Sequence, residues 1–243
     1  FGQRLGDRGL GGGGVGAGLG GGGGILAVAA GDGQQAERGE EGKRSFRHGD
    51  ESPIPGHTGQ NGAVISLDDM LTDLELLVNT ESTSLHLDLL AQSAAAVASV
   101  MERRLGSAPR LIDSPAGPHV LWSGGGTPKV LLVGHHDTVF PVGSVAARPF
   151  RVTDGKATGP GVFDMKAGIV QAVHATAALA DRSGVEILIT ADEEVGSDAS
   201  RELIEERAAA CGNVLVFEAS ADGGALKIAR KGTGTFEVVV HGR

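Results

Sequence analysis

Two histidines and an aspartate follow an apolar run that has the composition of a buried strand. The run is residues 129–133, and His135, His136 and Asp137 come after one intervening glycine. Side chains alternate along a strand, so His135 and Asp137 should lie on one side and His136 on the other. A metal-binding imidazole usually needs a hydrogen-bond partner on its second ring nitrogen, and a carboxylate two residues away can supply one. The pattern predicts His135 as a metal ligand, Asp137 as the residue that orients it, and His136 as a packing or loop residue.

Acidic residues follow two other apolar runs. Asp192, Glu193 and Glu194 come just after VEILIT, and Glu218 comes after VLVF. Adjacent carboxylates at the end of a buried strand repel one another and raise each other's pKa. A solvated loop is the common explanation of such an acidic run. A divalent cation would also remove the repulsion, with one glutamate as a ligand and its neighbour free to transfer protons. Glu218 repeats the arrangement, because a charge that follows four apolar residues needs a partner.

Asp164 lies in GPGVFDMKAG, directly before a helical pattern. A helix N-cap would be sufficient to explain an aspartate at this position. The glycine-rich stretch before it allows unusual backbone geometry, so this carboxylate could instead bridge two cations. One histidine and several carboxylates without a thiolate suit a hydrolytic Zn²⁺ centre, with Co²⁺ or Mn²⁺ as alternatives. Two such ions about 3.5–4 Å apart would hold a hydroxide and polarise a carbonyl.

The elements that must position these residues alternate between helix and strand patterns. Ser66 is a suitable N-cap for a helix whose apolar residues recur at three- and four-residue steps from Leu67 to Val78. A second helical pattern covers residues 85–105 and ends at Gly106. Further patterns predict strands at 110–112, 119–122, 129–134, 185–190, 213–217, 225–229 and 233–240, and helices at 165–180 and 197–209.

This alternation predicts an α/β fold, a three-layer sandwich with a largely parallel central sheet flanked by helices. Ligands of such sheets bind beyond the carboxyl ends of the strands. Three of these ends carry the polar clusters at 135–137, 192–194 and 218. We therefore expect the clusters to meet at one edge of the sheet.

Composition divides the chain and excludes several classes of function. Fourteen of the first 24 residues are glycine, so residues 1–62 are expected to be disordered or foreign to the fold. Residues 25–30 loosely resemble a signal peptide, but a cytoplasmic location is favoured over secretion. The net charge of −9 argues against a nucleic-acid groove and against binding to an anionic membrane surface. The single cysteine, Cys211, permits no internal disulfide and is expected to fill core space.

Four stretches together resemble a known family. GHHDTVF, PFRVTDGKATGPGVFDMKAG, ITADEEVGS and VFEAS occur in the order typical of the zinc-dependent exopeptidases and deacylases. This family includes glutamate carboxypeptidase, aminoacylase, acetylornithine deacetylase and succinyl-diaminopimelate desuccinylase, and the chain is most similar to the glutamate carboxypeptidase branch. The resemblance covers residues 67–243, so residues 63–232 are expected to be the N-terminal part of a metallopeptidase catalytic domain.

The resemblance implies a role for each candidate residue. His135, Asp164 and Glu218 would hold one zinc ion, and Asp164 and Glu194 would hold the second. Glu193 would be the general base, and a cis peptide bond would follow Asp164. The implied reaction is hydrolysis of an amide next to a free carboxylate, and the implied substrates are N-acyl amino acids or short peptides.

The same resemblance indicates what the chain lacks. KIARKGTGTFEVVVHGR is similar to the run into the family's lid domain, so residues 233–243 are interpreted as the start of a truncated lid and dimerisation domain. The family's second-zinc histidine and oxyanion histidine have no counterpart here, and a homodimer would need the missing lid. Losing an oxyanion donor costs about 10²–10³ in rate, so weak activity is expected. Two alternatives stay open: a catalytically dead metal- or peptide-binding remnant, and an α/β scaffold whose acids are only solvated.

Overall fold

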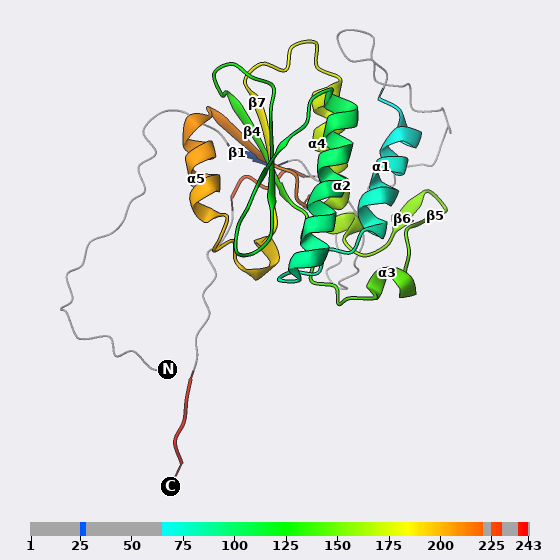
Figure 1. Ribbon diagram of the computed structural model, residues 1–243, viewed down its shortest axis with the longest axis vertical. Coiled ribbons are helices and arrows are strands. Elements are labelled where there is room, and N and C mark those ends of the chain that lie inside the picture. The colour runs from blue at the N-terminus through cyan, green and yellow to red at the C-terminus, as the bar shows by residue number, and fades with distance from the viewer. Residues whose placement is uncertain (1–24, 28–64, 221–224, 230–237, 243) are drawn as a thin grey trace, which may run out of the picture.

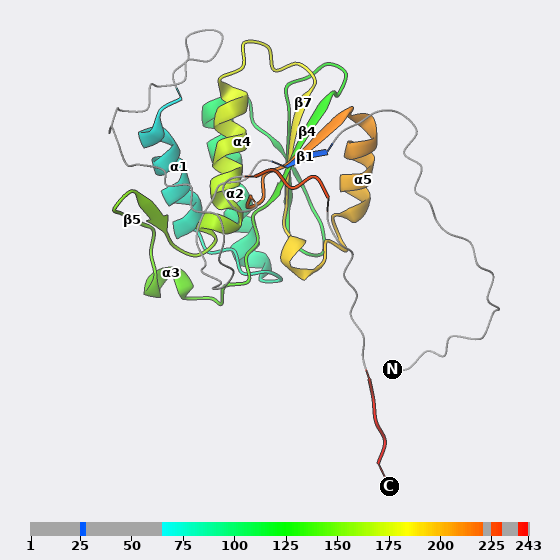
Figure 2. The same cartoon turned by 180° about the vertical axis from the view of Figure 1, so that it is seen from behind.

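The structure, a computed structural model, describes residues 25–27, 65–220, 225–229 and 238–242. A central sheet lies between two layers of helices (Figure 1). Helices α1, α2 and α4 cover one face of the sheet and α5 covers the other, as the reverse view also shows (Figure 2). The predicted fold class, a three-layer α/β sandwich, is confirmed.

Among the described residues, the sheet has six strands in the order β1-β8-β4-β7-β3-β2. Neighbouring strands run parallel from β1 to β7, and the last two strands, β3 and β2, pair antiparallel with their neighbours. The register places His135 opposite Thr190, and Val133 opposite Val216. The carboxyl ends of β8, β4 and β7 therefore meet at one edge, as the sequence predicts. The strands are β1 (Ile25–Ala27), β2 (Arg110–Ile112), β3 (His119–Ser123), β4 (Val130–His135), β7 (Val185–Thr190) and β8 (Asn213–Val216).

The helices begin and end close to the predicted positions. Ser66 is the N-cap of the first helix, and its hydroxyl accepts a hydrogen bond from the backbone N–H of Asp69. The second helix ends at Gly106, whose φ of 80° is the left-handed conformation that glycine adopts easily. The helices are α1 (Leu67–Asn79), α2 (Leu87–Leu105), α4 (Ala167–Ala177) and α5 (Arg201–Ala210).

Alternate residues of the strands fill two cores, one on each face of the sheet. Val120, Trp122 and Ile187 pack against α1, α2 and α4, whereas Leu121 and Leu188 pack toward α5. Cys211 joins this second, smaller core, as expected for a cysteine that fills space.

A buried charge network ties the three helices of the larger layer together. Asp73 of α1 is fully buried, and its carboxylate accepts hydrogen bonds from Arg103 Nη2 at 2.7 Å and Arg104 Nε at 2.6 Å, both of α2. The Nε2 of His174, on α4, lies 2.7 Å from the same carboxylate. Each charge is therefore paired inside the layer.

Several elements differ from the sequence-based expectations. The stretch before Asp164 contains a short helix, α3 (Ser144–Ala147), and a hairpin of β5 (Arg151–Thr153) and β6 (Lys156–Thr158). The strand predicted at 225–229 is wrong: only Ala225 takes part in a bridge, and all five residues are exposed, so no buried face holds them to the sheet. Of the strand predicted at 233–240, residues 238–240 have no regular structure and 233–237 lie outside the described residues.

The glycine-rich segment, residues 1–62, contributes one described element. Ile25–Ala27 form β1, which pairs in parallel with β8. The other residues of this segment lie outside the described part of the chain. Among the described residues, no helix is both long enough and apolar enough to cross a bilayer.

Candidate metal centre

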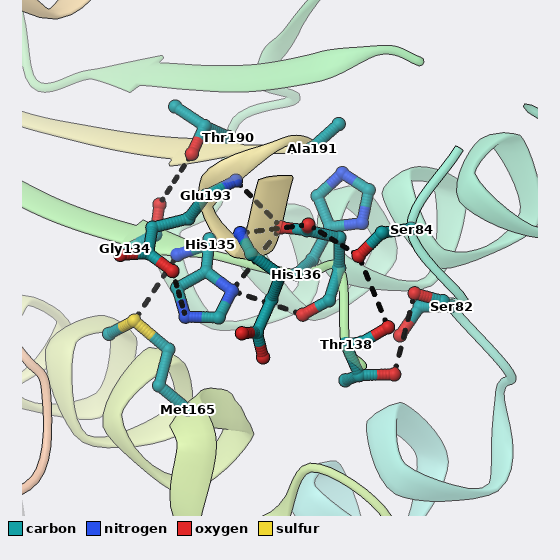
Figure 3. Close-up of polar contacts among 12 residues, drawn as sticks. Ser82, Ser84, Gly134, His135, His136, Thr138, Met165, Thr190, Ala191 and Glu193 are labelled. Atoms are coloured by element: carbon teal, nitrogen blue, oxygen red, sulfur yellow. Dashed lines mark hydrogen bonds and ion pairs between the residues drawn. The ribbon is translucent and has the colours of Figure 1, made fainter. Parts of the chain in front are cut away.

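The site is built around His135, the last residue of β4, which is 1% exposed. Its backbone N–H points to the sulfur of Met165 at 3.2 Å (Figure 3). Gly134 makes this approach possible, because a Cβ at that position would lie 2.8 Å from Met165 Cε. The central strand and the segment before α4 therefore pack directly against each other beneath the imidazole.

The two ring nitrogens of His135 face different partners. Nδ1 lies 3.0 Å from the backbone oxygen of Asp137 and 3.3 Å from its carboxylate. Nε2 faces three carboxylates, at 3.1 Å from Asp164, 3.0 Å from Glu218 and 3.8 Å from Glu193. The predicted pairing of His135 with Asp137 is therefore present, and the opposite nitrogen is turned toward the remaining acids.

The acids give the site a strongly negative potential. Burial alone would lower the pKa of His135, but hydrogen bonds to Asp137, Asp164 and Glu218 outweigh it and raise the pKa to about 12. Burial raises the pKa of both Glu193 and Glu194, and neighbouring carboxylates add to the effect. The hydrogen bond with His135 lowers the pKa of Asp164. A positive charge is therefore favoured at the centre of this cluster.

Asp137 is completely buried and connects the histidine to the acidic turn. Its two oxygens accept hydrogen bonds from the backbone N–H groups of Glu193 at 3.1 Å and Glu194 at 3.2 Å. The hydroxyl of Ser84 donates to the same carboxylate at 2.8 Å. Burial raises the pKa of Asp137, but its contacts with His135 and Ser84 outweigh this and leave it below the ordinary value. The residue is therefore held as a charged acceptor.

The three acidic residues after β7 have two different roles. Glu193 and Glu194 begin a short 3-10 helix, η2 (Glu193–Val195), and both lie at the site. Asp192 is buried and turned away from it, accepting hydrogen bonds from the backbone N–H groups of Ala199 at 2.8 Å and Ser200 at 3.2 Å. Asp192 therefore fixes the segment that leads into α5.

Asp164 reaches the site from a kinked segment before α4, η1 (Val162–Lys166), in which Asp164 and Met165 have non-helical backbone dihedral angles. The peptide bond between Asp164 and Met165 is cis, as the family resemblance predicts. The N-cap of α4 is Lys166, so Asp164 does not cap this helix. The Lys166 ammonium instead caps α1, donating to the backbone oxygens of Leu77 at 2.9 Å and Thr80 at 3.0 Å.

Glu218 follows β8 by two residues. The N–H of Phe217 continues the pairing with β4 by donating to the oxygen of Val133 at 3.2 Å. Gly168 of α4 packs against the Phe217 carbonyl so closely that a Cβ there would collide with it. Strand and helix therefore fix the backbone that carries Glu218.

The two other histidines near the site serve packing. His136 is fully buried, with Nδ1 at 3.1 Å from the Ser93 hydroxyl and Nε2 at 3.0 Å from the Pro118 oxygen, and burial lowers its pKa to about 4. This placement confirms that it faces away from His135. His119 was not predicted: it accepts a hydrogen bond from the N–H of Ala191 at 3.2 Å, and burial lowers its pKa. No motif surrounds His119 in the sequence, so only the antiparallel register of β3 could have indicated it.

The donor set fits a divalent cation. Among the described residues, two groups of three side chains could each hold a metal ion, because the donor atoms within each group all lie within 4.8 Å of one another. Both groups contain His135. One adds Glu193 and Glu218, and the other adds Asp164 and Glu194. Their mutual repulsion and the raised pKa of His135 are the electrostatic conditions that a bound cation relieves. The structure thus brings together all six predicted site residues, although Glu193 lies among the donors rather than outside them.

Part of the chain is similar in sequence to known proteins. Residues 131–238 match the model of Peptidase family M20/M25/M40. The chain is 36% identical over 126 residues to carboxypeptidase G2 of Pseudomonas sp. (strain RS-16), covering 49% of this chain and 30% of that protein. It is 34% identical over 133 residues to succinyl-diaminopimelate desuccinylase of Methylorubrum extorquens (strain PA1), covering 48% of this chain and 34% of that protein. The match thus spans about a third of the length of these relatives.

Solved structures of lower identity are similar in part. An M20 family metallo-carboxypeptidase from Sulfolobus solfataricus has a TM-score of 0.49 at 20% identity, covering 58% of this chain and 34% of that one. Human carnosine dipeptidase 1 has a TM-score of 0.49 at 23% identity, covering 61% and 38%. The family match itself includes every predicted ligand and the proposed general base. Residues 131–238 are therefore similar to a Peptidase M20 family domain.

Proposed function

We propose that this chain carries the catalytic part of a metal-dependent hydrolase that cleaves an amide or peptide bond next to a free carboxylate. The observation that carries the proposal is one buried imidazole nitrogen that lies 3.0–3.8 Å from carboxylates of three separate segments. A carboxypeptidase and a desuccinylase among the relatives support a carboxypeptidase or an N-acyl amino acid deacylase. N-acyl amino acids and short peptides are the corresponding substrates.

In this proposal the site holds two zinc ions, with Co²⁺ or Mn²⁺ as possible replacements. His135, Asp164 and Glu218 would hold one, and Asp164 and Glu194 the other. The ions, when bound, supply Lewis acidity to the substrate carbonyl and lower the pKa of an attacking water.

The chain's own groups position the site and handle the proton. Asp137 accepts the Nδ1 proton of His135, which keeps Nε2 directed at the metal position. Glu193 removes a proton from the attacking water and delivers it to the leaving amine. Burial of Glu193 raises its pKa, which suits a carboxylate that must accept a proton and then release it. The backbone N–H of Glu193 donates to Asp137, and this hydrogen bond fixes the backbone that carries the Glu193 carboxylate.

The test combines metal binding with turnover. The chain should retain zinc after dialysis and hydrolyse a member of a panel of N-acyl amino acids and dipeptides slowly, only with zinc present. Glu193→Ala should keep the zinc and lose about 10²–10⁴ in turnover, the usual contribution of a general base. A chain that binds no zinc contradicts the proposal. Zinc retained without turnover of any substrate would favour the alternative, a catalytically dead metal-binding remnant.

A further inference from the structure

Four groups contact the carboxylate of Asp137, and one of them, the Ser84 hydroxyl, comes from a distant part of the sequence. Oδ1 lies 3.3 Å from His135 Nδ1 and accepts from Glu193 N at 3.1 Å. Oδ2 accepts from Glu194 N at 3.2 Å and from the Ser84 hydroxyl at 2.8 Å. An ionised carboxylate offers about four acceptor sites, and three of them accept hydrogen bonds from Glu193 N, Glu194 N and the Ser84 hydroxyl.

Ser84 has its hydroxyl directed at this carboxylate. The hydroxyl carries one proton and has two acceptors within reach, Asp137 Oδ2 at 2.8 Å and the backbone oxygen of Thr138 at 3.2 Å. Hydrogen bonds to a charged acceptor are shorter and roughly twice as strong as those between neutral groups. The proton is therefore donated to Asp137.

The backbone that carries Ser84 is itself fixed against the segment after His135. Residues 82–84, between α1 and α2, form a strap: Ser84 N donates to the Thr138 oxygen at 3.1 Å, and Thr138 N donates to the Ser82 oxygen at 2.8 Å. The Thr83 hydroxyl donates to the Phe140 oxygen at 2.7 Å. Leu85, the next residue, has a φ of 64°, which is unfavourable for leucine and persists only where surrounding contacts impose it.

We propose that Ser84 is a positioning residue that acts on the metal centre through Asp137. Its hydrogen bond fixes the plane of the Asp137 carboxylate, so that the other three contacts orient His135 and anchor the peptides of Glu193 and Glu194. This inference rests on the proposed function for its consequence, which is metal affinity. Its structural claim, that Ser84 immobilises Asp137, applies to the metal-free chain as well.

The test uses three variants of the full chain. Ser84→Ala removes the hydroxyl, Ser84→Thr retains it, and Thr83→Val removes a strap hydrogen bond that does not reach Asp137. Zinc affinity is measured by competition with a chelator, and exchange of the Glu193 and Glu194 amide protons is measured by NMR without metal. Ser84→Ala should bind zinc about 10-fold more weakly, at the lower end of the effect of outer-shell partners, and both amides should exchange faster. Ser84→Thr should restore both values, and Thr83→Val should change neither.

The two readouts separate this inference from the proposed function. Faster amide exchange in Ser84→Ala, in a chain that binds no zinc, would support the positioning role and contradict the metal centre. Zinc binding and amide exchange that are both unchanged in Ser84→Ala would overturn the inference and leave the metal centre standing. Equal loss in Ser84→Ala and Thr83→Val would also overturn it, because the effect would then belong to the strap as a whole.

Discussion

The backbone N–H of Glu193 donates to Asp137 Oδ1 at 3.1 Å, and the same oxygen lies 3.3 Å from His135 Nδ1. One buried carboxylate therefore orients the histidine and holds the peptide of the proposed general base. A change at Asp137 should alter metal binding and proton transfer together, and not one of them alone.

Asp137→Asn tests this coupling. The amide keeps the size of the side chain but replaces one accepting oxygen by an NH₂ group, which then faces other donors. Zinc affinity should fall about 10–100-fold, the usual cost of removing a ligand's outer-shell partner. Chelator competition measures it. Asp181→Asn, beside Ser183 at the opposite end of the sheet, is the control and should bind zinc like the wild type. Equal affinity of the two variants would contradict the orienting role.

Zinc should stabilise the folded chain. A ligand at 100 times its dissociation constant adds about 2.7 kcal/mol when it binds only the folded state. The melting temperature should rise on adding zinc and return on adding EDTA. Glu218→Gln, on a side chain that is 32% exposed, should reduce this rise when each chain is compared with its own metal-free melting temperature. A rise that is as large in the variant would remove Glu218 from the ligand set.

Gly168→Ala should disturb the site through the backbone. The added Cβ would collide with the Phe217 carbonyl, so α4 or the end of β8 must shift and Glu218 with it. We expect weaker zinc binding and a lower melting temperature. Gly212→Ala is the matched control, because its Cβ would meet only the Lys129 oxygen, at an ordinary 3.6 Å. Should both variants bind zinc equally well, the contact between Gly168 and Phe217 does not position Glu218.

Asp73→Asn should destabilise the helical layer. It leaves Arg103, Arg104 and His174 facing a neutral group in a buried network. Breaking a buried ion pair costs about 3–5 kcal/mol, and the lower end is expected because the Arg103 side chain is 45% exposed. Urea denaturation of the metal-free chain measures the loss. A loss below about 1 kcal/mol, typical of surface pairs, would contradict the importance of this network.

Asp73 should also make the stability of the folded chain depend on pH. Burial raises the pKa of Asp73, but hydrogen bonds from Arg104, Arg103 and His174 outweigh it, so its pKa in the folded chain lies below the ordinary value. A carboxyl whose pKa is lowered by folding contributes stability that is present above its unfolded pKa of about 3.9 and is lost as the pH falls through the folded value. The stability difference between wild type and Asp73→Asn should therefore be constant near neutral pH and shrink below about pH 4. A difference that grows on acidification would give the pKa shift the opposite sign.

Local patterns predicted most of the scaffold. The apolar spacing after Ser66 located the first helix, and the apolar runs located the central strands within one or two residues. The hairpin of β5 and β6 was not predicted, because each strand has three residues, too few to show the two-residue alternation of a strand. The strand predicted at 225–229 failed because alternation alone does not supply a sheet neighbour or a buried face.

The site was predictable where a residue ends a strand and less so elsewhere. His135 and Glu218 follow apolar runs, so their position at the sheet edge was indicated. The sequence could not separate Asp192 from Glu193 and Glu194, because which acid turns inward depends on the N–H groups of Ala199 and Ser200. Ser84 carries no local signal, since its partner Asp137 lies 53 positions further along the chain.

The order of strands in the sheet has a consequence for how the chain acquires its site. Of β4, β7 and β8, the three strands whose carboxyl ends form the site, β8 is synthesised last, yet it pairs with β4, which is synthesised first. Until that long loop closes, the imidazole has no Glu218 beside it, and loop closure over such sequence separations is slow compared with helix formation. Assembly of the cluster should therefore coincide with the last cooperative stage of folding. Fraying of β8 would detach β1 and withdraw Glu218, a proposed ligand, while β4, β7, β3 and β2 stay paired.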